Sequence, residues 1–252
     1  MSGQTALPIV PQVSDDLLEQ YALKMMRLQE HDTPLQRVLH EIEQIAEKES
    51  VPIIGALEGR IMAALIQQRQ PAARAVLDIG TAIGYSAIWL SKVLGPQGKI
   101  TSIEIDPLRA ERARDFVRRA GVEEQVQIIT GDFFEIAPTL NVQYDIIFQD
   151  VMKHVYFAQD AGLALKLLEI SVACLAPDGI LLTDNAFCMG KVMQPSQYTQ
   201  VQGIQAYNEA IATHPALDSV LLPFRDGLWY SRRITEGLDS NQPRPAAGET
   251  IP

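Results

Sequence analysis

AVLDIGTAIGYSAIW, residues 75–89, joins an apolar run, a carboxylate and two spaced glycines in an order that decides the fold. The run at 75–79, interrupted only by Asp78, predicts a short buried strand that ends at the loop 80–84. From Tyr85 onward the apolar residues follow helical spacing, so the loop leads into a helix. Open α/β sheets bind ligands at such strand-to-helix junctions, and we expect a binding site here.

The spacing of the glycines indicates which ligand binds. A dinucleotide loop has three glycines, as G-x-G-x-x-G, so that backbone N–H groups can approach a pyrophosphate. This loop has only Gly80 and Gly84, and Asp78 stands two residues before the first of them. A second strand over 99–107, about 25 residues further on, has Glu104 near its carboxyl end, where a carboxylate can accept hydrogen bonds from both hydroxyls of a ribose. The sequence therefore predicts a nucleoside that carries an amine and a sulfonium rather than phosphates.

The composition limits the class of protein. With 252 residues, 47% of them apolar and 21% charged, the chain can bury one substantial α/β core. Its net charge of −10 and pI near 4.9 repel nucleic-acid backbones, so we expect no DNA or RNA partner. Cys174 and Cys188 make no disulfide framework, and no apolar run reaches the roughly 18 residues of a membrane span. We expect a cytoplasmic protein with no membrane partner.

Residues 1–70 predict a helical preface. Helices are expected at 14–30, 33–48 and 56–68, where apolar residues recur at helical intervals. Ser14-Asp15-Asp16 can cap the first of them, and Thr33-Pro34 opens the second, since a proline at the first turn is already set for a helix. Such amphipathic helices pack either on the core or on a second subunit.

Beyond residue 70, strands alternate with helices. Strands are expected at 126–129, 144–148, 180–183, 219–223 and 228–232, and helices at 109–119, 157–175 and 198–213. This alternation is typical of a mostly parallel sheet with helices on both faces. The Arg225-Asp226-Gly227 turn predicts that the last two strands are antiparallel neighbours. We expect a single domain over 1–236, with its core at 71–236 and a disordered tail at 237–252.

Polar side chains follow two of the central strands. The fourth strand leads to Asp150 and Lys153, and the fifth leads to Asp184 and Asn185. Two carboxylates and an amide oxygen from neighbouring strand ends would form a hard oxygen site, suited to Mg²⁺, Mn²⁺ or Ca²⁺ rather than to zinc. An aspartate at a strand end is also commonly a cap or turn residue, so the pattern alone leaves both interpretations open.

Six segments, in their order and spacing, carry a resemblance to a known family. They are GTAIGYSAIWL, IEIDP, GD at 131–132, FQDVMKHVY, LAPDGILLTDN and LPFRDGLWYSRR. The chain resembles class I S-adenosylmethionine-dependent methyltransferases. Among these it is similar to the metal-dependent O-methyltransferases that include catechol O-methyltransferase and the caffeoyl-CoA O-methyltransferase-like bacterial enzymes, over about residues 52–232. The resemblance implies a Rossmann-like α/β fold with a seven-stranded, mostly parallel sheet, an antiparallel last strand, helices on both faces and N-terminal helices.

The resemblance also assigns roles to residues. It implies a divalent cation, Mg²⁺ first and Mn²⁺ or Ca²⁺ as alternatives, held by Asp150, Asp184 and Asn185. Lys153 is implied to be the general base. The residues implied to bind S-adenosylmethionine are Asp78, Gly80, Thr81, Tyr85 and Ser86 near its methionine part, Glu104 on its ribose, Asp132 near its adenine, and Asp150. The implied reaction methylates a hydroxyl of a vicinal aromatic diol, whose oxygens the cation polarises and whose proton the lysine accepts.

Two positions depart from the family's pattern and bear on the acceptor. Relatives commonly read D-A-D-K-x-N-Y, whereas this chain has Met152 and Val155 in place of a carboxylate and an amide. If both face the acceptor, the pocket is more apolar, which favours a compact aromatic diol or a polyphenol over a CoA thioester. A metal-independent small-molecule methyltransferase and a catalytically silent S-adenosylmethionine-binding protein are the alternatives. We also expect a homodimer, with apolar faces of the preface helices at its interface or over the acceptor.

Overall fold

One sheet organises the part of the chain that the computed structural model describes, residues 15–26, 33–69, 71–151 and 160–234. Its strands are β1 (Ala75–Ile79), β2 (Lys99–Glu104), β3 (Val126–Thr130), β4 (Tyr144–Gln149), β5 (Leu175–Thr183), β6 (Leu217–Leu222) and β7 (Leu228–Arg233). The α-helices are α1 (Asp15–Met25), α2 (Pro34–Glu49), α3 (Gly55–Gln67), α4 (Tyr85–Ser91), α5 (Pro107–Arg119), α6 (Phe133–Ile136), α8 (Gly162–Cys174) and α9 (Thr199–Thr213). Short 3-10 helices are η1 (Ala137–Thr139) and η2 (Lys191–Met193).

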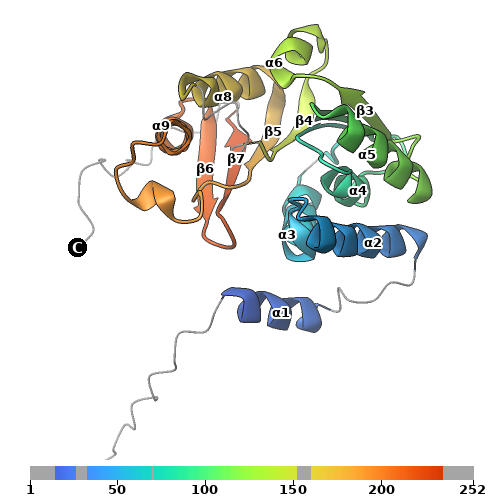
Figure 1. Cartoon of the computed structure of the whole chain (residues 1–252). Coiled ribbons are helices and arrows are strands. Elements are labelled where there is room, and N and C mark those ends of the chain that lie inside the picture. Colours follow the sequence, from blue (N-terminus) through green and yellow to red (C-terminus); the bar gives the residue numbers. More distant parts are fainter. Residues whose placement is uncertain (1–14, 27–32, 70, 152–159, 235–252) are drawn as a thin grey trace, which may run out of the picture.

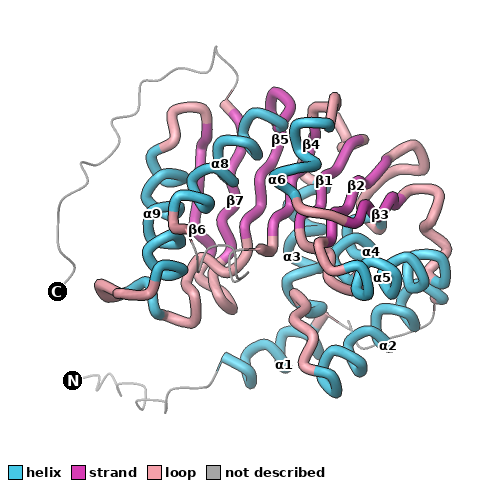
Figure 2. Tube along the Cα trace, turned by 45° about the horizontal axis from the view of Figure 1, so that its top comes forward, coloured by secondary structure: helices cyan, strands magenta, loops and turns pink. Residues whose placement is uncertain are grey.

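The strands lie in the order β3-β2-β1-β4-β5-β7-β6, with β3 and β6 at the two edges (Figure 1), and Figure 2 labels all seven. Strand β7 runs antiparallel to both of its neighbours. Strand β1 pairs in parallel with both β2 and β4, so the chain reverses its direction of travel across the sheet at this point. Such a switch point leaves a crevice at the carboxyl ends of the strands. The order confirms the seven-stranded, mostly parallel Rossmann-like sheet that the sequence predicts, including the antiparallel pairing of the last two strands.

The helices form two layers, with α8 and α9 on one side of the sheet and α3, α4 and α5 on the other (Figure 2). Val76 and Ile146 belong to the core under α2 to α5, whereas Leu77 and Ile147 belong to the core under α8 and α9. Successive strand residues point to opposite faces, so the position along a strand decides which layer a side chain meets. Asp78 therefore lies on the same face as Val76, beneath α4.

The observed elements follow the expected ones closely, with a later start of α8, at Gly162, and a larger difference at β5. This strand begins at Leu175, which pairs with Tyr144, rather than at Ile180. The register then shifts, and Ile146 pairs with Ile180. The shift accommodates Pro177-Asp178-Gly179, which the sequence suggests is only a turn before the strand.

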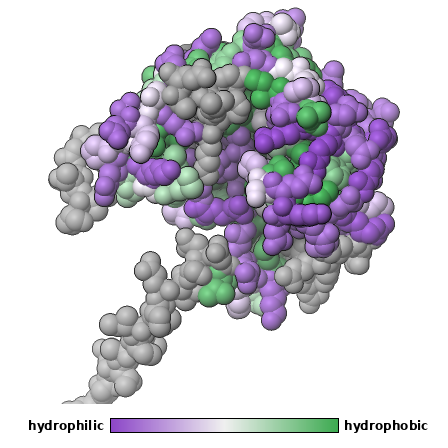
Figure 3. Space-filling view, viewed as in Figure 1, coloured by the Kyte–Doolittle hydropathy of each residue, from purple (hydrophilic) through white to green (hydrophobic). Residues whose placement is uncertain are grey.

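Helix α2 is part of the core. Its buried residues are Val38, Leu39, Ile42 and Ala46. Tyr85 of α4 donates a hydrogen bond of 2.5 Å to Glu43, and Arg112 of α5 lies 2.7 Å from Glu49. Figure 3 shows mainly hydrophilic side chains over α2 and α5. The apolar face of α2 is thus covered within the chain, so it no longer supports the expected dimer.

Helix α1 is held much more loosely. Leu18 and Tyr21 are 55% and 64% exposed, and the ion pair of α1 with the core joins Glu19 to Arg225 at 2.8 Å. Helix α1 ends at Met25, earlier than the predicted end near residue 30. The predicted helix start at 157 and the predicted tail lie outside the described residues. In the part of the chain that is described, no helix has the length and apolar character needed to cross a membrane.

Candidate active site

A cavity of about 370 Å³ opens beyond the carboxyl ends of β1, β2, β4 and β5. This is the expected ligand crevice of the sheet, and its volume is in the range of small-molecule sites. The lining residues include Pro52, Ile53, Ile79, Gly80, Ala82, Ile103, Glu104, Ile105, Arg109, Gly131, Phe133, Asp150, Val151, Asp184, Asn185, Arg225 and Asp226. Carboxylates from three strand ends thus share one apolar-walled cavity.

Gly80 lets the first loop pass close to the end of β4. Its φ is +92°, and a Cβ there would lie 2.7 Å from Val151 Cγ1 and 2.8 Å from the Asp150 carbonyl oxygen. A side chain at this position is therefore excluded by conformation and by space. The backbone of the loop consequently forms the cavity wall, as the two-glycine pattern predicts.

Glu104 lies in the wall as a fixed hydrogen-bond acceptor. It is 5% exposed; its Oε2 accepts from the Ala82 N–H at 2.8 Å and its Oε1 from the Asp106 N–H at 2.9 Å. Two backbone donors therefore orient the carboxylate, and each oxygen keeps a further lone pair. This geometry suits the predicted contact with the two hydroxyls of a ribose.

Asp78 is buried beside the loop and does not line the cavity. Its Oδ2 accepts hydrogen bonds from Ser102 at 2.7 Å and from Ser86 at 3.1 Å, while its Oδ1 has no hydrogen-bond partner among the described residues. Burial raises the pKa of this carboxyl from 3.8 to about 6, although the hydroxyls of Ser102, Thr81 and Ser86 lower it. An uncompensated buried oxygen of this kind is available to a donor such as an amine, which is what the sequence predicts for it.

Four other predicted cofactor residues are also not among those that line the cavity. Thr81 is buried, Ser86 is used by Asp78, and the Tyr85 hydroxyl donates to Glu43 of α2. Asp132 caps α6 by accepting from the Phe134 N–H at 2.7 Å, while its neighbours line the cavity. Their direct contact with a cofactor stays a prediction.

Asp150, Asp184 and Asn185 come together as the strand ends predict. The Asn185 amide nitrogen donates to Asp150 at 2.5 Å and to Asp184 at 3.0 Å, so one side chain bridges both carboxylates. Asn185 has a φ of +68°, a left-handed conformation that asparagine tolerates better than most residues. The Asp184 carboxylate stabilises this turn by accepting from the Asn185 backbone N–H at 2.6 Å.

A buried polar network lies directly beneath these three residues. Gln149 donates to Thr183 at 2.7 Å and also to Tyr207, and the Thr183 and Tyr207 hydroxyls are 2.8 Å apart. Ser171 of α8 donates to the Gln149 amide oxygen at 3.3 Å. Gln149 and Thr183 immediately precede Asp150 and Asp184, so the network fixes the relative positions of the two strand ends.

Lys153, Met152 and Val155 lie in the segment 152–159, outside the described residues. Their predicted roles are therefore carried by the sequence alone. Across the described ranges, no group of three or more His, Cys, Asp and Glu side chains has the arrangement of a metal site. The set formed by Asp150, Asp184 and Asn185 contains two such side chains and an amide.

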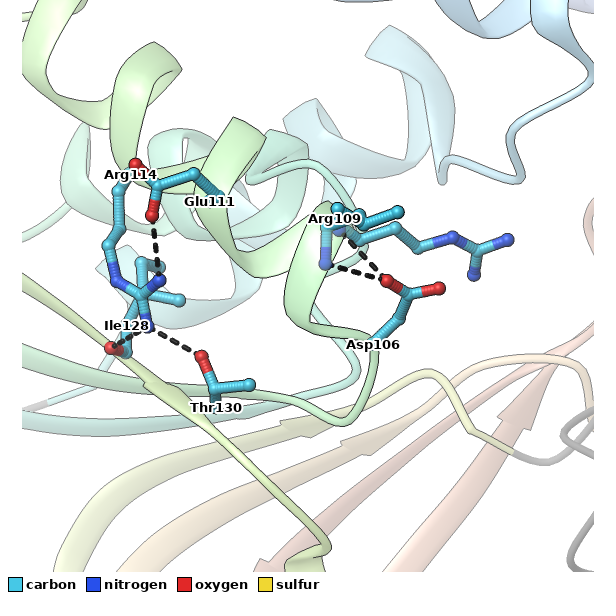
Figure 4. A network of polar contacts seen from close by, with 7 residues as sticks. Asp106, Arg109, Glu111, Arg114, Ile128 and Thr130 are labelled. Atoms are coloured by element: carbon cyan, nitrogen blue, oxygen red, sulfur yellow. Dashed lines mark hydrogen bonds and ion pairs between the residues drawn. The ribbon is translucent and has the colours of Figure 1, made fainter.

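Several cavity residues are absent from the sequence prediction. Ile53 precedes α3, and Arg225 comes from the turn between β6 and β7, which the sequence marks only as a turn. Arg109 belongs to the first turn of α5, which Asp106 caps through the Leu108 and Arg109 N–H groups, and Figure 4 shows its guanidinium extending past that carboxylate. Of these three residues, only Arg109 lies where the sequence itself indicates a site, just after the Asp106-Pro107 start of a helix.

The fold and the cavity define a class I methyltransferase, a Rossmann-like sheet with its ligand crevice at the switch point. A family model described as O-methyltransferase matches residues 29–234, and the chain belongs to this family. It is an enzyme of the S-adenosylmethionine-dependent O-methyltransferases.

Individual relatives agree with this assignment. Catechol O-methyltransferase of Niastella koreensis is 31% identical over 170 residues, covering 66% of this chain and 72% of that protein. Catechol O-methyltransferase of Mycobacterium tuberculosis is 28% identical over 170 residues, covering 67% and 73%. The solved O-methyltransferase from Bacillus cereus in complex with SAH has a TM-score of 0.73 and 25% identity, covering 86% of this chain and 97% of that one.

The raised pKa of Asp78 predicts a pH dependence of stability. Between about pH 4 and pH 6 the unfolded carboxyl loses its proton while the folded one retains it, so the free energy of unfolding falls as pH rises. The shift from 3.8 to about 6 corresponds to roughly 3 kcal/mol. Asp78→Asn should remove this loss. In urea unfolding of the cofactor-free protein, the free energy of unfolding of the variant should therefore rise relative to that of the wild type across this interval. The exposed Asp218→Asn is the control, and parallel curves for Asp78→Asn and wild type would contradict the assignment.

Proposed function

We propose that this chain is a divalent-cation-dependent O-methyltransferase that methylates one hydroxyl of a vicinal aromatic diol. The observation that carries the proposal is the convergence of Asp150, Asp184 and Asn185 on the cavity that Glu104 also lines. One end of the cavity suits the nucleoside of the methyl donor, and the other offers hard oxygen ligands for a cation. Donor and acceptor can therefore be held side by side. Similarity to two proteins named catechol O-methyltransferase supports an acceptor of this class.

The cofactor end of the cavity fits a nucleoside donor. S-adenosylmethionine supplies a methyl group on a sulfonium, which already carries a good leaving group. Glu104 would accept from the ribose, since its orientation is set by Ala82 and Asp106 before any ligand arrives. Ile105 and Phe133 line the same cavity and offer an apolar surface to a base. The chain's contribution is therefore positioning, with little reorganisation on binding.

The acceptor end fits a hard cation. Asp150 and Asp184 supply two carboxylates, and the Asn185 amide exchanges its nitrogen for its oxygen by a half-turn about its last torsion. A bound divalent cation supplies Lewis-acid polarisation of the two diol oxygens. The chain's own task is to hold two like charges close together, which the buried network beneath them supports.

Lys153 is proposed as the general base. It follows Asp150 by three residues, and the family resemblance gives a lysine at this position that role. It would accept the phenol proton as the oxygen attacks the methyl group. The apolar Ile53 and Val151 in the cavity wall would limit access of water to that step.

The charge of the cavity favours a compact uncharged diol over a CoA thioester. Asp150, Asp184 and Asp226 line the cavity, and Arg225 is already paired with acidic side chains. With a bound cation these charges roughly cancel, so phosphate groups would gain no net attraction at this end. The apolar replacements at Met152 and Val155, outside the described residues, favour the same class of acceptor.

The two alternatives differ from this proposal in cation dependence and in turnover. A metal-independent methyltransferase would work equally well with a chelator present, and a silent binding protein would bind S-adenosylmethionine without transferring its methyl group. A transfer screen over catechols, caffeate, flavonoids and CoA thioesters, with and without Mg²⁺, separates all three.

Asp184→Ala should abolish turnover and leave S-adenosylmethionine affinity unchanged. The substitution removes a cation ligand and a full charge. The loss in kcat/KM should therefore exceed the roughly 10–100-fold loss that follows removal of a hydrogen-bond partner of a metal ligand. Calorimetry measures the affinity, and assays with Mg²⁺ or EDTA measure the turnover. Asp160→Ala, an exposed aspartate outside the cavity, is the matched control. Full activity after dialysis against EDTA would exclude cation dependence.

Lys153→Ala should lower kcat by about 10²–10⁴-fold, the usual contribution of a positioned general base. Affinities for Mn²⁺ and S-adenosylmethionine should change little, because the lysine holds neither. Lys191→Ala, exposed in η2, controls for the loss of a lysine near the site. Wild-type kcat at pH 7 in Lys153→Ala would mean that the proton leaves by another route.

We propose that the enzyme is a homodimer in which α1 contributes to the interface. The apolar residues Leu17, Leu18, Tyr21 and Met25 of this helix are more than half exposed. Light scattering at micromolar concentration should give a dimer mass for the wild type and a monomer mass for Leu18→Glu combined with Tyr21→Glu. Leu108→Glu, at an exposed position of α5, should remain dimeric. A monomeric wild type would refute this proposal.

A further inference from the structure

Glu58 of α3 is a buried carboxylate that faces Arg225, a residue of the cavity wall. It is 1% exposed, although it belongs to a residue type that is rarely buried unless it is paired. The next residue, Gly59, explains why the helix comes so close to the core, because a Cβ there would lie 2.5 Å from the Trp89 ring. Close packing of α3 on α4 therefore fixes Glu58 in the interior.

The pairing of Glu58 is incomplete. Its Oε2 lies 3.6 Å from Arg225 Nε, too far for a strong hydrogen bond, and its Oε1 is buried with no hydrogen-bond partner in the described part of the chain. Arg225 also lies 2.8 Å from Glu19, so one guanidinium serves two carboxylates. A buried charge compensated this poorly should cost several kcal/mol.

The acidic neighbours of Glu58 further disfavour its ionised form. Burial is the first cause that raises the pKa of this carboxyl, and repulsion by Asp184 and then by Asp150 follows. Arg225 opposes these effects but does not outweigh them. Arg225 joins Glu58 to the cavity that Asp150 and Asp184 line, and a positive charge added there would favour the ionised form of Glu58.

We propose that Glu58 is a third carboxylate of the cation site, which acts through space to strengthen cation binding by Asp150, Asp184 and Asn185. Glu58 does not line the cavity, so it is a positioning and charge-supplying residue rather than a ligand. Arg225 has the opposite effect, because its guanidinium lies in the cavity wall and repels the same cation. This inference rests on the proposed cation dependence.

A purely structural role for the Glu58–Arg225 pair leads to a different expectation. If the pair only anchors the β6–β7 turn, removing either partner disturbs the site in the same way, and both variants bind the cation more weakly. If the pair sets the charge of the site, the two variants change cation affinity in opposite directions. The sign of the change separates the two roles.

The experiment measures Mn²⁺ affinity of the full chain at pH 8, by electron paramagnetic resonance of free Mn²⁺, in the absence of acceptor. Glu58→Gln should bind Mn²⁺ about 10-fold more weakly than wild type, and Arg225→Gln should bind it more tightly. Glu58→Asp keeps the charge and should retain most of the affinity. Glu49→Gln, which breaks an exposed ion pair with Arg112, should bind as wild type does.

Thermal unfolding and S-adenosylmethionine affinity show whether each variant is folded. If Glu58→Gln fails to fold, Glu58→Asp and Arg225→Gln still test the sign. Wild-type affinity in Glu58→Gln, or weaker binding in both Glu58→Gln and Arg225→Gln, would overturn the inference and leave the proposed function standing. Absence of Mn²⁺ binding by the wild type would instead overturn the cation site itself.

Discussion

Gln149 and Thr183 stand opposite each other at the last paired positions of β4 and β5, and a buried hydrogen bond of 2.7 Å joins their side chains. Tyr207 of α9 contacts both, and burial raises the pKa of its hydroxyl, which keeps it a neutral donor and acceptor. A slip of one residue between the strands would break this network and turn each following side chain to the other face. Asp150 and Asp184 follow directly, so their convergence depends on this contact.

The parts of the site that the sequence predicts are those that depend on chain position alone. A residue at or just after the end of a parallel strand must lie at the carboxyl edge of the sheet, which is why the sequence predicts the positions of Glu104, Asp150 and Asp184. Gly80 is predicted for a similar local reason, since its loop follows directly after a strand, and its φ of +92° is one that glycine adopts readily. The mostly parallel sheet follows from the same alternation of elements, and the antiparallel pairing of β6 and β7 follows from the turn before β7.

The remaining features depend on contacts between segments far apart in the sequence. Tyr85 begins the helix after the glycine loop, but its hydroxyl is taken by Glu43 of α2, and no local pattern reveals that helix as its neighbour. For the same reason the sequence does not reveal the contact between Glu58 and Arg225, which forms only when α3 and the β6–β7 turn meet. The sequence does not predict the first residues of β5, because a register shift lets Pro177-Asp178-Gly179 stay within the strand.

The N-terminal helices differ in how they are bound to the core, and the difference has consequences for the site. Helix α2 is held by buried apolar side chains and by Glu43 and Glu49, so it forms part of the folded unit. Helix α1 exposes most of its apolar residues and is joined to the core by the ion pair of Glu19 with Arg225. Because the same guanidinium faces Glu58, any movement of α1 that releases Glu19 strengthens the remaining pair. The position of a surface helix and the charge beside Asp150 and Asp184 are thus coupled through one arginine.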